Sequence, residues 1–298
     1  MTDFIYEYLS KSARSMAYKR QYRNIARHVR MFSDVSGIII NTNSFTEQVM
    51  EEFVAYLRSK NLMMSTIRNI RQKVSAMINK AEKRGYLVER GFENVVVKTE
   101  DSCAIYLTVD ELKRLNELKS LSKQAQAVRD RFLVGCFTAL RISDYRRLTV
   151  EDNFNFDKGF IQIKTQKTGV VVTIPIHPII YDVLKRNKNV LPVMPTQQAF
   201  GKTIKRICKK AGIADEVLWE RTVGARVVRK KVKKYQLISS HTARRSGATN
   251  MYLAGITTAR IMLLTGHQTE QAFFRYIRIA REENAKTLSE HDFLKKNL

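Results

Sequence analysis

A single break in the apolar pattern divides the chain into two parts. Before it, apolar residues recur with the 3.6-residue period of amphipathic helices; between Val95 and Ala104, in V-V-V-K-T-E-D-S-C-A, that period fades. After it, Thr108 and Glu111 have the spacing of a capping box, so a new helix is expected to begin there. A chain of 298 residues has the length of about two domains. We therefore predict an N-terminal domain over 1–98, a linker over 99–104 and a second domain over 105–298.

The N-terminal part is predicted to be a small helical bundle. Between Tyr18 and Phe32 the apolar residues share one helical face, and arginines at positions 20, 23, 27 and 30 share the other. Ser44 and Glu47 have capping-box spacing and are expected to open a second helix. A third helix is expected to begin near Ser65, with the apolar residues at 67, 70, 74, 77 and 81 facing inward. The arginine stripe is either a binding face for a polyanion or an ordinary solvated face, because the pattern fits both.

The second part is predicted to be mostly helical with a small β element. Phe160–Thr165 and Val170–Ile174 each alternate apolar and polar residues, and the short Gln166–Gly169 segment between them is typical of a hairpin turn. A second segment, Arg221–Tyr235, carries seven basic residues and no acid, so we expect a basic β-hairpin or loop there. Glycine (12 residues) and proline (4) are scarce, which favours a helix-rich protein.

Charge supplies the first functional indication. The net charge is +25, of which about +8 lies in residues 1–98 and +17 in the rest, so both parts could bind one polyanion. A basic solubility surface or a ribosome-associated protein is the alternative. The three scattered cysteines lack disulfide or zinc spacing, which fits a reducing cytoplasm. The sequence shows no signal peptide and no apolar run long enough to span a membrane.

The second part also carries a set of residues suited to phosphodiester chemistry. Taken singly, each could be a helix cap, a solvated turn residue or a packing residue. Together, paired guanidinium groups can hold phosphate oxygens, a lysine and histidines can move protons, and a tyrosine can be a nucleophile, with no metal-binding cluster in sight. These candidate catalytic residues are Arg141, Lys167, His241, Arg244, His267 and Tyr276.

In their order along the chain these residues resemble the signature of the tyrosine recombinases, the phage-integrase family, which carries R…K…H-x-x-R…H…Y. The segment Leu264–Tyr276, L-T-G-H-Q-T-E-Q-A-F-F-R-Y, resembles the last box of that family, although Phe273 stands where the family often has threonine. Phe273 and Phe274 are expected to pack. The resemblance covers nearly the whole chain and implies a mainly α fold with a small β-sheet: a SAM-like helical core-binding bundle and a mixed α/β catalytic domain.

The resemblance implies transesterification on DNA without metal, ATP or other cofactor. Tyr276 would attack a phosphodiester, form a 3′-phosphotyrosyl bond and free a 5′-hydroxyl, while Arg141 and Arg244 would stabilise the transition state. Arg245 also lies within a turn of the preceding histidine and is the alternative to Arg244. The implied partners are double-stranded DNA with core recombination sites and a homotetramer assembled on it from a monomer or weak oligomer. DNA-bending accessory proteins could join that assembly.

The same resemblance implies the remaining roles. Lys167 would be the general acid toward the 5′-oxygen, with Lys164 three residues upstream as the alternative. His241 would assist proton transfer, and His267 would hydrogen-bond the phosphate. Asp144 stands where the family often has glutamate three residues after the first arginine, so we expect it to keep a supporting role.

Other functions compete with this one. A type IB topoisomerase uses a similar set of residues as a monomer, and a non-catalytic helix-turn-helix regulator could use Gly266 as its turn. The separate N-terminal bundle and the H-x-x-R histidine favour a recombinase. The C-terminal segment 285–298 resembles tails that dock on a neighbouring protomer, with a frayed end as the alternative. The basic segment Arg221–Tyr235 is expected to contact phosphates or a neighbouring protomer.

Overall fold

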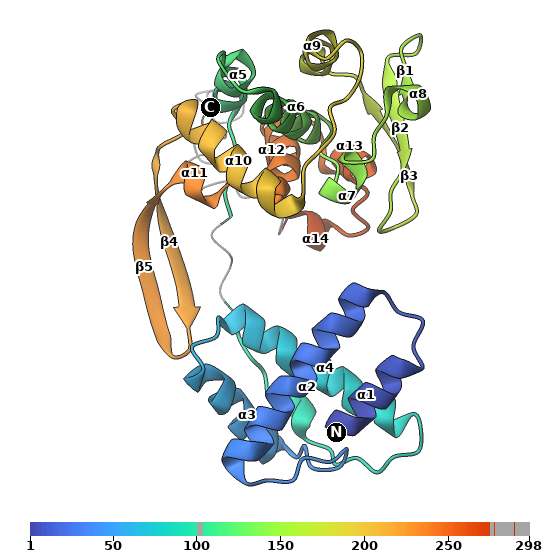
Figure 1. Cartoon of the computed structure of the whole chain (residues 1–298), viewed down its shortest axis with the longest axis vertical. Coiled ribbons are helices and arrows are strands. Elements are labelled where there is room, and N and C mark those ends of the chain that lie inside the picture. The colour runs from blue at the N-terminus through green and yellow to red at the C-terminus, as the bar shows by residue number, and fades with distance from the viewer. Residues whose placement is uncertain (100–103, 275–276, 278–288, 290–298) are drawn as a thin grey trace, which may run out of the picture. The chain divides into compact units, whose positions relative to one another are not determined.

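The computed structural model describes residues 1–99, 104–274, 277 and 289, which fold into helices and two small antiparallel sheets (Figure 1). They form two compact units. The first holds the described residues of 1–103 together with Leu218–Lys230, and the second holds the remaining described residues. No described helix is both long enough and apolar enough to cross a membrane. The expectation of a mainly helical protein with a small sheet is confirmed.

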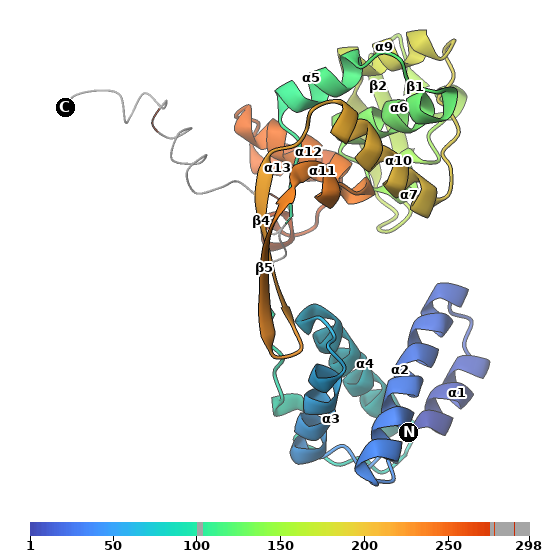
Figure 2. The same cartoon turned by 60° about the vertical axis from the view of Figure 1, so that its left-hand side comes forward.

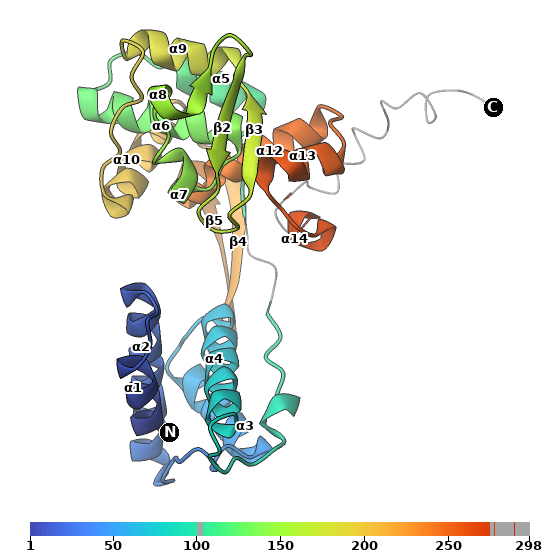
Figure 3. The same cartoon turned by 90° about the vertical axis from the view of Figure 1, so that its right-hand side faces the viewer.

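The N-terminal unit is the expected helical bundle. Figure 3 shows α1 beside α2, and α3 beside α4. The apolar faces meet in one core, where Ile25, Phe53 and Val74 are at most 2% exposed. The predicted inward faces of α2 and α4 are therefore confirmed. The helices are α1 (Thr2–Ser10), α2 (Met16–Ser36), α3 (Glu47–Ser59), α4 (Met64–Glu82) and the short 3-10 helix η1 (Phe92–Asn94).

The predicted start of α3 is wrong by two residues. Thr46, not Ser44, is the N-cap, and its hydroxyl accepts a hydrogen bond from the N–H of Val49 at 3.2 Å. The Ser44 hydroxyl instead donates to the carbonyl of Ile39 and so closes the preceding turn. Two hydroxyl residues lie within one turn of the helix start, and the N-cap in the folded protein is Thr46, whose backbone is extended.

The second unit is built around α6, an apolar helix that α5, α9, α10 and α12 surround. The predicted capping box at its entry is confirmed, because Thr108 and Glu111 satisfy each other's backbone N–H groups. Its helices are α5 (Val109–Glu117), α6 (Lys123–Thr138), α7 (Ile142–Tyr145), α8 (Val150–Asn153), α9 (Pro178–Arg186), α10 (Gln197–Lys210), α11 (Lys234–Leu237), α12 (Ser240–Leu253), α13 (Thr258–Thr265) and α14 (Glu270–Phe274).

A three-stranded antiparallel sheet in the order β1-β2-β3 covers one side of this unit (Figure 1). In the β2–β3 pair, Ile161 lies opposite Ile174 and Ile163 opposite Val172, and all four are buried. The alternation read from the sequence thus predicted both the hairpin and its inward face. The strands are β1 (Phe154–Asn155), β2 (Phe160–Lys164) and β3 (Val171–Pro175).

The basic segment forms a second hairpin, of strands β4 (Glu216–Val223) and β5 (Arg226–Lys233), as a long two-stranded ribbon (Figure 2). Cross-strand pairs line it, including the ion pair of Arg229 with Glu220 and Lys230 over the ring of Trp219 at 4.7 Å. At the tip, the N–H of Gly224 donates to the carbonyl of Leu62 at 2.8 Å, inside the first unit. Side-chain pairs and this tip contact supply stability that a bare two-stranded ribbon lacks.

Candidate active site

Two glycines let the central helices of the second unit approach closely. A Cβ on Gly247 of α12 would lie 2.1 Å from the carbonyl oxygen of Cys136 in α6, and one on Gly135 would lie 2.8 Å from the ring of Tyr145. Only glycine permits this backbone distance, so the packing of α12 against α6 depends on it. The side chains of α12 are thereby held against the C-terminal end of α6, where the first candidate arginine follows.

Arg141 follows a left-handed turn at that end of α6. Ala139 ends the helix with φ of +49°, a conformation that is rare for a residue with a Cβ and common near functional sites. Arg141 is then the N-cap of α7, partly buried, and its Nη1 is buried without a hydrogen-bond partner among the described residues. A buried guanidinium donor without an acceptor is costly, and an anionic oxygen would satisfy it.

Asp144 joins α7 to the loop between β2 and β3. The carboxylate is fully buried, and its Oδ1 accepts hydrogen bonds from the N–H of Gln166 at 2.8 Å and from Nη2 of Arg147 at 3.4 Å. The hydroxyls of Thr165 and Thr168 lie 2.8 Å apart and tighten the same loop. Asp144 therefore holds the backbone next to Lys167, as the supporting role of this acid requires.

Lys167 lies at the exposed tip of that loop, whereas Lys164 lies on the exposed side of β2. The backbone carbonyl of Lys164 accepts a hydrogen bond from Arg147, so Lys164 helps to hold β2 in place. The positive charge of Lys167, by contrast, is close enough to His267 to lower the pKa of that histidine. The structure thus brings Lys167 to the cluster.

Two adjacent arginines of α12 point to different partners. Arg244 is 1% exposed, and its guanidinium donates to the carbonyls of Ala139 at 3.0 Å and Thr265 at 2.7 Å. Arg245 donates instead to the carbonyl of Ile105 at 3.2 Å, at the start of the unit. Of the two, it is Arg244 that reaches the turn after α6 and the end of α13.

His267 lies against Arg244 at the end of α13. Gly266, with φ of +65°, ends that helix and turns the chain so that Nε2 of His267 lies 3.1 Å from Nη2 of Arg244. Burial, followed by the charges of Arg244, Arg141 and Lys167, lowers the pKa of His267 to about 4. The histidine is neutral at neutral pH, and three basic side chains from separate segments act on it electrostatically.

His241 stands at the exposed first turn of α12. Partial burial, then the charges of Arg245, Arg244 and Arg141, lowers its pKa below the ordinary value. It is therefore a neutral imidazole near the arginines, able to accept a proton. The structure places both candidate histidines within the electric field of Arg141 and Arg244.

Tyr276, the candidate nucleophile, lies outside the described residues. Beside it in sequence, Phe273 is fully buried against Ala248 and Ile261, as expected. Phe274 also packs, with its ring centroid 6.4 Å from that of Tyr252, but it stays 48% exposed at the surface of the unit.

Two supporting residues escaped the sequence analysis. Arg131, inside the apolar run of α6, is buried and donates to the carbonyls of Tyr145, Leu148 and Pro192, which closes the turn after α7. Burial lowers its pKa to about 10. Thr265 lies between Arg244 and His267. The sequence signal for Arg131 was a charged residue in the middle of an apolar helix. The signal for Thr265 was a hydroxyl residue just before Gly266.

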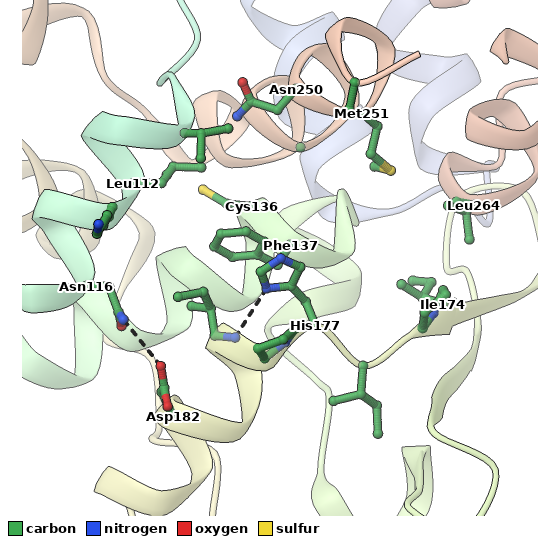
Figure 4. Close-up of a pocket in the computed structure, with 18 of the residues that line it drawn as sticks. Leu112, Asn116, Cys136, Phe137, Ile174, His177, Asp182, Asn250, Met251 and Leu264 are labelled. Carbon is green, nitrogen blue, oxygen red and sulfur yellow. Dashed lines mark hydrogen bonds between the residues drawn. The ribbon is translucent and has the colours of Figure 1, made fainter. Parts of the chain in front are cut away.

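A separate apolar groove lies elsewhere on the same unit (Figure 4). It encloses about 830 Å³ between α5, the start of α9, α12 and α13, and is lined by apolar side chains such as Leu112, Met251 and Leu264. At its floor the ring of His177 stacks on Phe137 at 4.1 Å, and its Nδ1 accepts a hydrogen bond from a backbone N–H of α9. Its apolar lining is unsuited to phosphate chemistry.

A helical bundle followed by a unit that gathers two arginines, a lysine and two histidines defines a protein of the tyrosine-recombinase type. The chain belongs to the phage integrase family. The family model matches residues 105–283, and the model of the phage integrase SAM-like domain matches residues 1–99. The resemblance to the phage-integrase family and the two-part fold, both expected from the sequence, are thereby confirmed.

Known proteins are similar over most of the chain. The tyrosine recombinase XerA of Pyrococcus furiosus is 29% identical over 231 residues, covering 76% of this chain and 74% of that protein. The Tn1549 transposon integrase in complex with circular intermediate DNA superposes with a TM-score of 0.68 at 16% identity, covering 97% of this chain and 99% of that chain. A lambda integrase dimer bound to a core site gives 0.69 at 14% identity, covering 93% and 95%. At these identities the structural likenesses establish the fold.

Proposed function

We propose that this protein is a site-specific tyrosine recombinase that cleaves and rejoins double-stranded DNA through a 3′-phosphotyrosyl intermediate. The convergence of five basic side chains from separate segments carries the proposal. Arg141, Lys167 and Arg244 act electrostatically on His267, and the buried Nη1 of Arg141 lacks a partner among the residues that the structure describes. A phosphate group would satisfy these donors, and a non-catalytic DNA-binding regulator would have no use for such a cluster.

In the proposed reaction, the Tyr276 oxygen attacks the phosphorus of a DNA phosphodiester. The new bond joins tyrosine to the 3′-phosphate, the bond to the 5′-oxygen breaks, and that oxygen leaves as a hydroxyl. Arg141 and Arg244 neutralise the charge that develops on the non-bridging oxygens. A 5′-hydroxyl of a partner strand then reverses the step. Because the phosphotyrosyl bond conserves the energy of the phosphodiester, the reaction consumes no ATP.

The proton movements fall to Lys167 and His241. Lys167 stands on a loop that Asp144 holds by its backbone, and it gives a proton to the leaving 5′-oxygen. His241 is neutral because burial and three arginines lower its pKa, so it can accept the proton of the tyrosine hydroxyl. Asp144 acts as a positioning residue in this scheme.

Double-stranded DNA is the proposed partner. Both units are basic, and the net charge of +25 favours a polyanion whose binding weakens as salt rises. Related structures include a lambda integrase tetramer bound to a Holliday junction and the XerH recombinase bound to a palindromic difH substrate. We therefore propose four protomers on two duplexes. Each protomer has a core-binding domain over 1–98, a linker over 99–104 and a catalytic domain over 105–298 into which the β4–β5 hairpin is inserted.

DNA-bending accessory proteins are also part of this proposal. So is a cytoplasmic location, which the free buried thiols of Cys136 and Cys208 favour.

The apolar groove supports the tetramer. An exposed apolar groove of this size on a charged protein marks an interaction surface. The segment 285–298 carries Leu288, Phe293 and Leu294 among charged residues, the composition of an amphipathic tail. We propose that this tail occupies the groove of a neighbouring protomer. Deleting 285–298 is then expected to leave DNA binding by the monomer and abolish tetramers; unchanged tetramers would refute the assignment.

A nicked DNA duplex that traps the covalent intermediate tests the central proposal. The nick lets the short fragment with the free 5′-hydroxyl diffuse away, so the protein–DNA adduct accumulates and runs slowly on a denaturing gel. Because the core site is unknown, the substrate carries the junction of the element that encodes the protein. We expect an adduct with the wild type and none with Tyr276→Phe. The matched control is Tyr181→Phe on α9, which should form the adduct normally.

A two-site assay separates recombination from simple relaxation of supercoils. We expect exchange between two core sites on one plasmid, with relaxation only as a minor product. Relaxation of a plasmid without a core site, together with no exchange, would instead favour the type IB topoisomerase.

A further inference from the structure

Thr265 is the buried last residue of α13, two residues before His267. It is 0% exposed, and its hydroxyl oxygen lies 2.8 Å from the carbonyl of Ile261 and 2.8 Å from Nδ1 of His267. Its own carbonyl accepts a hydrogen bond from Arg244 at 2.7 Å. Thr265 thus contacts both the arginine and the histidine of the candidate active site.

The direction of each hydrogen bond follows from what each group can donate. A guanidinium has only donors, so Nε2 of His267 must accept from Nη2 of Arg244 and carries no proton. Because the histidine is neutral, its single ring proton lies on Nδ1 and is donated to the Thr265 hydroxyl. That hydroxyl in turn donates its own proton to Ile261. One chain of donors therefore runs from Arg244 through His267 and Thr265 to the backbone of α13.

We infer that Thr265 is a positioning residue that fixes the ring proton of His267 on Nδ1 and thereby holds the histidine to Arg244 in the DNA-free protein. A threonine hydroxyl can accept from Nδ1 and donate to a helix carbonyl at once, which an apolar side chain at this place cannot do. The role concerns orientation and protonation, since Thr265 is buried behind the histidine.

This inference rests on the proposed function for its consequence in the reaction. If Nε2 of His267 hydrogen-bonds a phosphate oxygen, it needs a proton there that the DNA-free tautomer lacks. Phosphate entry would therefore release Nη2 of Arg244 from the histidine, and the ring would take up a second proton from solvent on Nε2 while Nδ1–H continues to donate to Thr265. The charges of Arg244, Arg141 and Lys167 act on the ring, and the centroid of the Phe273 ring lies 5.7 Å from that of His267, so a second proton becomes favourable only with an incoming anion.

Nitrogen NMR of the full-length, DNA-free protein labelled with ¹⁵N-histidine tests the inference directly, because the two ring nitrogens of each tautomer have distinct shifts. His267→Gln identifies the signal among the five histidines. We expect a protonated Nδ1 and a bare Nε2 in the wild type and in Thr265→Ser. Thr265→Val keeps the branched shape but removes the acceptor of the Nδ1 proton, so the proton should move to Nε2 and the hydrogen bond from Arg244 should break. A wild-type proton on Nε2, or an unchanged tautomer in Thr265→Val, would overturn the inference.

The cleavage rate on the nicked substrate provides the second measurement. Thr265→Ser should cleave at nearly the wild-type rate, and Thr265→Val should be slower by roughly 3- to 10-fold, the effect of losing one buried hydrogen bond that orients the histidine. Equal rates for both variants would overturn the link to catalysis. If the wild type forms no adduct, the proposed function fails, and the NMR result still decides the role of Thr265 in the free protein.

Discussion

Replacing Gly247 by alanine should disrupt the active site from a distance. The added Cβ would lie 2.1 Å from the carbonyl oxygen of Cys136, and ordinary contact begins near 3.4 Å. Helices α6 and α12 must then separate by at least about 1.3 Å, because the obstacle is backbone and no side chain can rotate away. Arg244 lies one turn before this glycine and holds the carbonyl of Ala139 at 3.0 Å, so the separation weakens that bond.

The expected magnitude combines two opposing effects. Overpacking of a dense core costs about 1–3 kcal/mol, and alanine in place of glycine inside a helix returns about 1 kcal/mol. We expect a net destabilisation of the second unit of about 0–2 kcal/mol. A displacement of about 1 Å at a catalytic group costs on the order of 100-fold in rate, so cleavage should fall far more than stability.

A second helical glycine supplies the control. Gly201 in α10 has nothing within 4 Å of the place where a Cβ would stand, so Gly201→Ala should stabilise the protein by about 0.5–1 kcal/mol and leave cleavage unchanged. Urea unfolding followed by circular dichroism gives the stability, and the nicked substrate gives the rate. If Gly247→Ala were as stable and as active as Gly201→Ala, the close approach of α6 and α12 would not be what positions Arg244.

Three further changes test other parts of the site. Arg244→Lys should reduce cleavage by roughly 100-fold, since one ammonium cannot reproduce the fork of donors, whereas Arg245→Lys should cost less than 10-fold; reversed effects in a single-turnover assay would exchange their roles. Asp144→Asn should leave the fold intact and slow cleavage by about 10-fold, because a neutral amide holds the N–H of Gln166 more weakly, and a wild-type rate would contradict its positioning role. The pKa of His267 is lowered to about 4 from an ordinary 6.5, so the folded protein binds fewer protons than the unfolded chain below pH 6.5. The free energy of unfolding that comes from the neutral histidine is present above pH 6.5 and is lost as the pH falls toward 4. The His267→Gln variant should therefore lose less stability than the wild type over that range, by at most about 3 kcal/mol before solvent screening. If stability measured by urea unfolding falls with pH in parallel for both proteins, this reasoning is refuted.

Local patterns predicted the elements whose stability is local. The apolar faces of α2 and α4, the capping box at Thr108 and the β2–β3 hairpin all follow from spacing along a few turns or strand residues, and each is present. The start of α3 was misplaced because Ser44 and Thr46 both have a capping hydroxyl. The packing of Phe273 and Phe274 was expected, but a five-residue helix has too little periodicity to predict that only Phe273 is fully buried.

The sequence by itself supplied the candidate catalytic residues, and the resemblance of their order to the phage-integrase signature implied the family and the fold class. The H-x-x-R spacing favours Arg244 over its neighbour Arg245, and only the tertiary structure shows that the two guanidinium groups have different hydrogen-bond partners. Successive residues of a helix point in different directions, so Arg244 reaches the carbonyl of Ala139 and Arg245 reaches that of Ile105. The role of Thr265 emerged in the same way, from hydrogen bonds that join α12 and α13 across 21 residues of chain.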